Sequence, residues 1–120
     1  MMIRDLKNAL DAYIPKIYIV GMRKTFKGIV GFEWDDGNRD KNKLKHQVST
    51  GEAEQVFFNQ PLVILDDKKH SHNEPRYAAF GTTDKNRRLL VIYTLRDQKI
   101  RVISARDMHR KERVFYEQEG

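Results

Sequence analysis

The hydrophobic and polar positions in the first half of the chain predict a short strand followed by a polar helix. Residues 32–34 have the composition of a strand, and Asp35 or Asp36 can cap a helix that runs to about His46. Leu44 is the only aliphatic residue in that helix. A helix with so little apolar surface is expected to expose most of its side chains to solvent.

A second helix is predicted directly after the first. The segment Ser49–Glu52 matches a capping box, in which two residues three positions apart satisfy each other's backbone N–H groups. Ala53, Val56 and Phe57 then share one helical face, which is expected to pack on a core.

The rest of the chain alternates short apolar runs with turn residues. Four runs are typical of strands, and a final helix is expected from Met108 to about Gln118; the runs are residues 62–65, 76–81, 89–95 and 100–105. The short loops between them favour antiparallel hairpins over parallel crossovers. The sequence therefore predicts an α+β fold: a twisted antiparallel sheet of about four strands, with two helices before it and one C-terminal helix.

The first 31 residues are interpreted as an attachment to this domain. Ile3, Leu6 and Leu10 follow helical spacing as far as Pro15, and residues 16–20 could be extended. We therefore divide the chain into an N-terminal extension, residues 1–31, to which no role is assigned, and a single domain, residues 32–120. Met22 could equally be the true start, in which case residues 1–21 would have no function.

The charge distribution indicates a polyanionic partner. The chain has 120 residues and a net charge of +6, and residues 84–113 contain ten Lys and Arg against four Asp and Glu. Nucleic acid is the first candidate partner, although many soluble proteins are basic without binding any. The chain has no cysteine and no apolar run long enough to span a membrane, so we expect a cytoplasmic location and no membrane contact.

Two groups of residues could transfer protons. Asn42, Lys45 and His46 are spaced to share one helical face, where a histidine would act beside a cation. Glu74 and Arg76 are two positions apart at the start of a predicted strand and would point to the same side. A solvated helix and an ordinary surface ion pair explain these groups more simply, so neither group alone indicates a function.

Arginines alternate with aliphatic residues along the last predicted strand and continue into the last helix. Val102, Ser104 and Arg106 are expected on one face of the strand, and Arg106 begins a row with Arg110 and Arg113. A guanidinium group can donate two parallel hydrogen bonds to a phosphate. This pattern therefore favours contact with nucleic acid over a role in solubility alone. The residues that we expect to bind RNA are Lys99, Arg101, Arg110 and Arg113.

A metal site is the weaker interpretation of the loop before the second strand. His70 and His72 lie near Asp66, Asp67 and Glu74, but their spacing matches no tight motif and a Lys-Lys pair lies among them. We therefore expect a polar loop, no metal and no cofactor.

Taken in order, these motifs resemble the BrnT-type toxins over residues 32–117. The first half of the resemblance is carried by Phe32-Glu33-Trp34-Asp35, Asn42, Lys45-His46, Val48, Glu52-Ala53 and Val56-Phe57. The second half is carried by Glu74, Arg76, Gly81, Leu89-Leu90-Val91, Tyr93-Thr94, Arg96, Ile100-Arg101-Val102-Ile103-Ser104-Ala105-Arg106, Glu112-Arg113 and Tyr116. The chain departs from the family in its extension and in Gln47, which follows Lys-His where the family usually has Gly. Because Gly would allow a left-handed helix end, Gln47 is expected to strain or reshape that end.

The resemblance implies a RelE-like fold and a ribonuclease that needs no metal. It also implies a ribbon-helix-helix (BrnA-like) antitoxin that forms a heterotetramer with the toxin and alone contacts operator DNA. In related ribonucleases the RNA 2′-hydroxyl attacks the adjacent phosphate, and basic side chains stabilise the developing charge. Carried over position by position, the candidate catalytic residues are Lys45, His46, Glu74, Arg76, Arg96 and Arg106.

Two functions remain open at this point. One is a metal-independent endoribonuclease, in which Glu74 or His46 accepts the 2′-hydroxyl proton. The other is a non-catalytic nucleic-acid-binding or regulatory module on the same fold, which the clustered arginines support equally well. The presence of His46 and Glu74 beside the cations favours the enzyme, because a simple binding protein would not need them.

Overall fold

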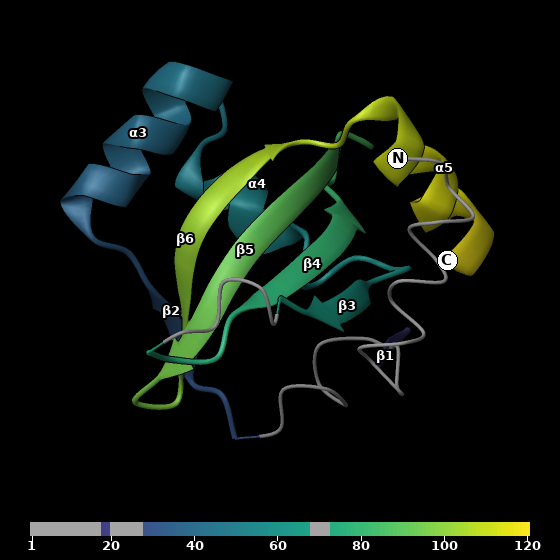
Figure 1. Cartoon of the computed structure of the whole chain (residues 1–120). Helices are drawn as coiled ribbons and strands as arrows, with labels where there is room; N and C mark the ends of the chain where they lie inside the picture. Colours follow the sequence, from purple (N-terminus) through teal and green to yellow (C-terminus); the bar gives the residue numbers. More distant parts are fainter. Residues whose placement is uncertain (1–17, 20–27, 68–72) are drawn as a thin grey trace.

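The computed structural model describes residues 18–19, 28–67 and 73–120. Their strands form one six-stranded sheet in the order β1-β3-β4-β5-β6-β2 (Figure 1). The strands are β1 (Tyr18–Ile19), β2 (Gly31–Glu33), β3 (Val63–Asp66), β4 (Tyr77–Thr82), β5 (Arg88–Arg96) and β6 (Lys99–Asp107). The helices are α3 (Asp36–His46), α4 (Thr50–Gln55) and α5 (Arg110–Glu119). Among the described residues, no helix is long and apolar enough to cross a membrane.

The predicted α+β class and the four antiparallel strands are confirmed, but the predicted number of strands was too low. The sheet also includes the short β1 and β2, which match the segments predicted to be extended (16–20) and a strand (32–34) but were not counted in the predicted sheet. Both lie at its edges, and β2 pairs in parallel with β6 through Phe32 and Ile100. Because β2 precedes α3 and α4, these helices lie between strands in the sequence and not before the whole sheet. The predicted helix near the N-terminus and the loop containing His70 and His72 lie outside the described residues.

The helix starts follow the predicted capping chemistry. Of the two candidates at α3, Asp35 is the cap, because its side chain accepts the Asn38 N–H at 2.7 Å. At α4 both halves of the capping box are present: Ser49 Oγ accepts the Glu52 N–H, and Glu52 Oε1 accepts the Ser49 N–H, each at 3.1 Å. These contacts satisfy backbone donors that a helix start leaves without partners.

The sheet is covered on both faces, and β5 alternates between the two cores. Leu89, Val91 and Tyr93 face the core with α4, where Phe57 meets the Tyr93 ring edge-on at a centroid distance of 5.2 Å. Leu90 belongs to the opposite core, whose other members include residues of α5. Figure 1 shows α4 behind the sheet, α3 beside β6, and α5 across the end of the sheet. Only part of the α5 face is covered, and the site described below lies there.

A β-bulge in β6 overturns the predicted facing of its side chains. Tyr93 pairs with Val102, but Ile92 pairs with Ser104, so one extra residue is inserted in β6. Val102 therefore lies in the α4 core, whereas Ser104 and Arg106 lie on the opposite face. The prediction that these three residues share a face was wrong, because it assumed an uninterrupted two-residue alternation.

We expect Gly81→Ala to destabilise the protein, because Gly81 lies where β4 meets α4. A Cβ atom at residue 81 would lie 2.5 Å from Val56 Cγ1 and 3.2 Å from the Val56 carbonyl oxygen. Overpacking of this kind costs about 1–3 kcal/mol in the free energy of unfolding, measured by urea denaturation. Gly51→Ala is the matched control, because a Cβ there meets nothing within 4 Å. Equal stability of the two variants would show that α4 can move away from the sheet without cost.

Candidate active site

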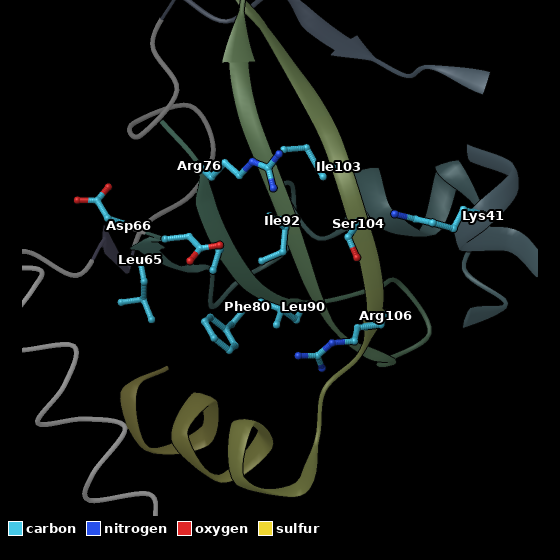
Figure 2. Close-up of a pocket in the computed structure, with 12 residues that line it drawn as sticks. Lys41, Leu65, Asp66, Arg76, Phe80, Leu90, Ile92, Ile103, Ser104 and Arg106 are labelled. Carbon is cyan, nitrogen blue, oxygen red and sulfur yellow. The ribbon is translucent and has the colours of Figure 1, made fainter. Parts of the chain in front are cut away.

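A hollow of about 550 Å³ lies on the face of the sheet that carries α5 (Figure 2). Its apolar lining comes from four neighbouring strands and consists of Leu65, Ala78, Phe80, Leu90, Ile92 and Ile103. Its polar lining consists of Lys41, Asp66, Asp67, Arg76, Ser104 and Arg106. Arg76 and Arg106 lie toward opposite ends with Ile92 between them, and Lys41 extends from α3 toward the Ser104 side (Figure 2). The fold thus brings together two of the predicted catalytic residues and one lysine that was not predicted.

The Arg106 guanidinium is held in place by α5 but keeps one edge available for a ligand. Its Nη1 and Nη2 atoms donate to the Glu112 carboxylate at 2.8 and 3.0 Å, and Nη1 also donates to the Asp107 carbonyl at 3.0 Å. Within the described part of the chain, the Nε–H and the second Nη2–H have no such partner. These two donors form the side edge that binds a carboxylate or phosphate in a bidentate manner. Arg106 is therefore both fixed and able to bind an anion.

The Glu112 carboxylate that holds Arg106 is itself stabilised in its charged form. Burial alone raises the pKa of Glu112, but hydrogen bonds from Arg106 and from the His109 N–H, at 2.7 Å, lower it below its usual value. The carboxylate is therefore ionised at neutral pH and keeps the ion pair with Arg106 intact.

His46 lies at the end of α3, near the Arg106 end of the hollow but not in its lining. Burial lowers the pKa of His46 below 6.5, and the positive charges of Lys45, Arg106 and Lys41 lower it further, against the opposing effect of Asp107. The imidazole is therefore neutral at pH 7 and able to accept a proton. Lys45 is exposed on the same helix end and acts electrostatically on His46, as Arg106 does.

Asn42, the third member of the predicted α3 face, has a structural role. Its side chain is 1% exposed, and its Oδ1 accepts the Ala105 N–H of β6 at 3.2 Å. It therefore links α3 to the strand that carries Arg106.

Glu74 and Arg96 form a separate group near the β5–β6 turn. Arg96 Nη2 lies 3.0 Å from Glu74 Oε2, and this contact raises the pKa of Arg96. Arg101 pairs with Glu33 at 3.3 Å and with Asp35 at 3.1 Å. None of these residues lines the hollow, so the structure separates Glu74 and Arg96 from Arg106.

The other predicted RNA-binding residues lie on exposed surfaces. Lys99 is exposed at the β5–β6 turn, and Arg110 and Arg113 are exposed on α5. Arg113 Nη1 donates to the Met108 carbonyl at 3.0 Å. Among the described residues, no group of three His, Asp or Glu side chains is placed to hold a metal ion.

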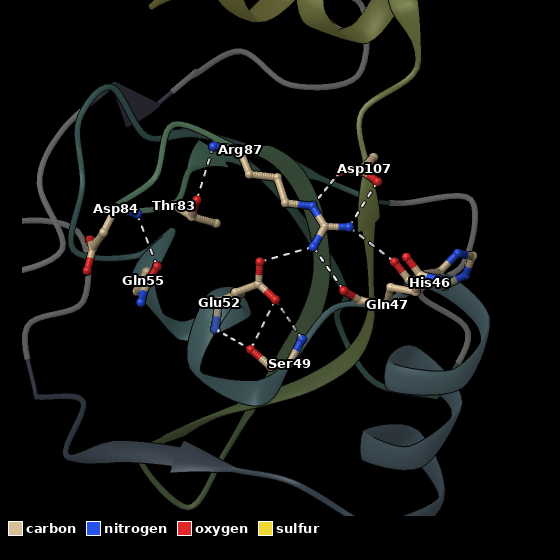
Figure 3. A network of polar contacts seen from close by, with 9 residues as sticks. All are labelled: His46, Gln47, Ser49, Glu52, Gln55, Thr83, Asp84, Arg87 and Asp107. Carbon is tan, nitrogen blue, oxygen red and sulfur yellow. Dashed lines mark hydrogen bonds and ion pairs between the residues drawn. The ribbon is translucent and has the colours of Figure 1, made fainter.

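Arg87 forms the largest polar network near the site, and sequence reasoning missed it. Its guanidinium contacts the Asp107 carboxylate at 2.7 and 3.0 Å, Glu52 Oε2 at 3.0 Å, and the carbonyls of His46 and Gln47 at 3.1 and 2.9 Å (Figure 3). Hydrogen bonds to Asp107 are the main cause of the raised pKa of Arg87. No local sequence pattern predicts this network, because each partner of the guanidinium is 20 or more residues from Arg87 in the sequence.

Gln47 ends α3 in the left-handed conformation that glycine prefers. Its φ and ψ angles are 56° and 36°, and its N–H donates to the carbonyls of Asn42 and Lys43. The helix end therefore has the geometry that a glycine would allow, and Gln47 bears the steric cost of adopting it.

An α+β domain with two arginines and a lysine lining one hollow of its sheet has the geometry expected of proteins that bind polyanions. Residues 34–112 match the model of the family described as "Ribonuclease toxin, BrnT, of type II toxin-antitoxin system". This match covers well over half of the chain, and the chain belongs to that family. The resemblance predicted from the sequence is thereby confirmed.

The crystal structure of the Brucella abortus ribonuclease toxin BrnT is similar in fold. It aligns with a TM-score of 0.53 and 20% sequence identity, over 68% of this chain and 99% of that one. At this identity the likeness concerns the fold alone. A search of curated proteins finds no match.

We expect Gln47→Gly to stabilise the protein, because glycine adopts positive φ angles without a steric penalty. The gain in the free energy of unfolding is about 1 kcal/mol, measured by urea denaturation. Gln47→Ala is the matched control, because alanine keeps the Cβ atom that causes the strain. A gain of equal size in both variants would mean that the Gln47 side chain, and not its backbone angle, is the source of the cost.

Proposed function

We propose that this chain is an endoribonuclease toxin that cleaves RNA, without a metal, at the hollow between Arg76 and Arg106. The observation that carries the proposal is that Arg76, Arg106 and Lys41 line one hollow with an apolar floor. Guanidinium and ammonium groups suit the phosphates of RNA, and the floor between them suits the flat, apolar face of a base. Family membership supports this function, because the family is described as ribonuclease toxins.

The cations supply the charge stabilisation that the reaction requires. The 2′-hydroxyl oxygen bonds to the adjacent phosphorus, and the bond from phosphorus to the 5′-oxygen breaks. Negative charge grows on the non-bridging oxygens, which the side edge of Arg106 can bind, while Arg76 at the opposite end of the hollow can bind a neighbouring phosphate of the same RNA. The products are a 2′,3′-cyclic phosphate and a 5′-hydroxyl, and the latter takes its proton from water.

His46 is the better placed of the two candidate bases. It is neutral at pH 7, and it lies close enough to Arg106 for the arginine to lower its pKa. Neither candidate lines the hollow, but Glu74 is paired with Arg96 at 3.0 Å near the β5–β6 turn. We therefore propose that His46 accepts the 2′-hydroxyl proton and that Lys45 adds positive charge beside it.

The toxin–antitoxin family also supplies a partner. We propose that a ribbon-helix-helix (BrnA-like) antitoxin binds the toxin in the cytoplasm, forms a heterotetramer with it, and alone contacts operator DNA. An acidic segment of the antitoxin would cover the hollow, because its cations attract carboxylates as they attract phosphates. The same surface would then serve both the substrate and the inhibitor.

RNA cleavage by the purified protein in EDTA tests the catalytic proposal. We expect cleavage to survive chelation and to leave 2′,3′-cyclic phosphate ends. Arg76→Ala and Arg106→Ala should each lower kcat/KM by about a hundredfold, as the loss of one stabilising group does in comparable sites.

Arg39→Ala is the control for this assay, because Arg39 is exposed on α3 and pairs with Asp36. Tight, salt-sensitive RNA binding without cleavage would favour the non-catalytic module instead. Full cleavage by both hollow variants would place the active site elsewhere.

Binding of a ribbon-helix-helix antitoxin of this family tests the occlusion proposal. We expect Arg106→Glu to weaken that complex by at least about tenfold, because it places a carboxylate against an acidic segment. Arg39→Glu, with the same change of charge on the outer surface of α3, should leave the affinity within about twofold. Isothermal titration calorimetry measures both, and equal affinities would show that the antitoxin leaves the hollow open.

A further inference from the structure

Arg87 lies outside the hollow, yet its side chain contacts both structural elements that carry the proposed chemistry. All five N–H groups of the Arg87 guanidinium have an acceptor. Nε and Nη2 donate to Asp107, Nη1 donates to Glu52, and the second N–H groups of Nη1 and Nη2 donate to the carbonyls of Gln47 and His46. One of these carbonyls belongs to His46 itself, and Asp107 directly follows Arg106 in β6. The backbone of the proton acceptor and the residue next to the anion-binding arginine are therefore joined through a single side chain (Figure 3).

We propose that Arg87 is a positioning residue for RNA cleavage, which fixes the His46 end of α3 relative to Arg106 on β6. This inference rests on the proposed function for its catalytic consequence. Its structural part, the placement of His46, stands on the contacts alone and can be measured without RNA.

The weak apolar attachment of α3 makes this role necessary. The helix buries only Asn42, and its one aliphatic residue, Leu44, is 82% exposed. Its place in the fold therefore depends on polar links. Asp35 pairs with Arg101 at the start of the helix, Asn42 binds the Ala105 N–H in the middle, and Arg87 holds the end.

Arginine is needed at this position because its donors point in fixed directions in one plane. The last carbonyls of a helix have no partner within the helix, and Arg87 satisfies the carbonyls at the end of α3 while pairing with two carboxylates. A lysine at residue 87 would keep the positive charge but would offer three donors on one atom, which cannot reach all of these groups. Arg87→Lys therefore removes the geometric link and keeps the charge.

The first test is a titration of His46 by NMR, with and without Arg87→Lys. Among the signals of the four histidines, the one that is missing from the His46→Gln variant belongs to His46. In the natural chain we expect the pKa of His46 to lie below 6.5, because burial, Lys45, Arg106 and Lys41 all lower it. In Arg87→Lys the helix end moves away from Arg106 and becomes more hydrated, so the pKa should rise toward 6.5.

The second test is the pH profile of RNA cleavage by the same proteins. We expect Arg87→Lys to lower kcat by about tenfold or more and to leave KM within about twofold, because a misplaced base slows the chemical step without loss of binding. The acid limb of kcat should move to higher pH, because activity requires neutral His46. Urea unfolding of each variant verifies that the assays are run on folded protein.

Arg88→Lys is the matched control, because the neighbouring Arg88 pairs with Glu117 on α5. It should change neither the pKa of His46 nor the pH profile. An unchanged His46 pKa in Arg87→Lys would overturn the inference, as would a wild-type kcat and pH profile in the folded variant. If the natural chain cleaves no RNA, the proposed function fails, and the His46 titration still decides whether Arg87 positions this residue.

Discussion

The polar attachment of α3 is the constraint on which the rest of the site depends. A helix with an apolar face is placed by burial, which tolerates small shifts because hydrophobic contacts are not directional. Hydrogen bonds and bidentate ion pairs are directional, so three such links fix α3 more narrowly than its composition suggests. The helix that carries Lys41, Lys45 and His46 can thus remain exposed to a polyanion and still hold these groups in a defined place.

Much of the fold could be predicted from the sequence because its signals are local. The capping box at Ser49, the apolar run of β5 and the turn residues between strands each act within a few positions. The short strand β2 was not placed in the predicted sheet, because its partner, β6, is more than sixty residues away in the sequence. Its contribution depends on tertiary pairing, which no local pattern encodes.

The candidate site was predictable only in its residue types. Arg76, Arg106 and His46 were identified from the family resemblance, and the structure brings Arg76 and Arg106 into one hollow. Lys41 resembled any other lysine of a solvated helix, and Arg87 resembled a turn residue. Their importance comes from the elements that fold against them. Glu74 and Arg96 show the opposite case, because the family resemblance suggested a role beside Arg106, whereas the structure pairs them with each other near the β5–β6 turn.

The bulge in β6 has a consequence for how this strand can change in evolution. The inserted residue turns Arg106 from the core face to the hollow, so the strand's length decides which side of the sheet receives a charge. Substitutions in the strand alter one contact at a time. Deletion of the inserted residue, Ile103, would restore regular pairing and leave Arg106 on the face of the hollow, whereas a single-codon insertion would exchange the two faces of the strand's end and direct an arginine into the core. The strand can therefore lose one residue at the bulge without reversing its end, but it cannot gain one.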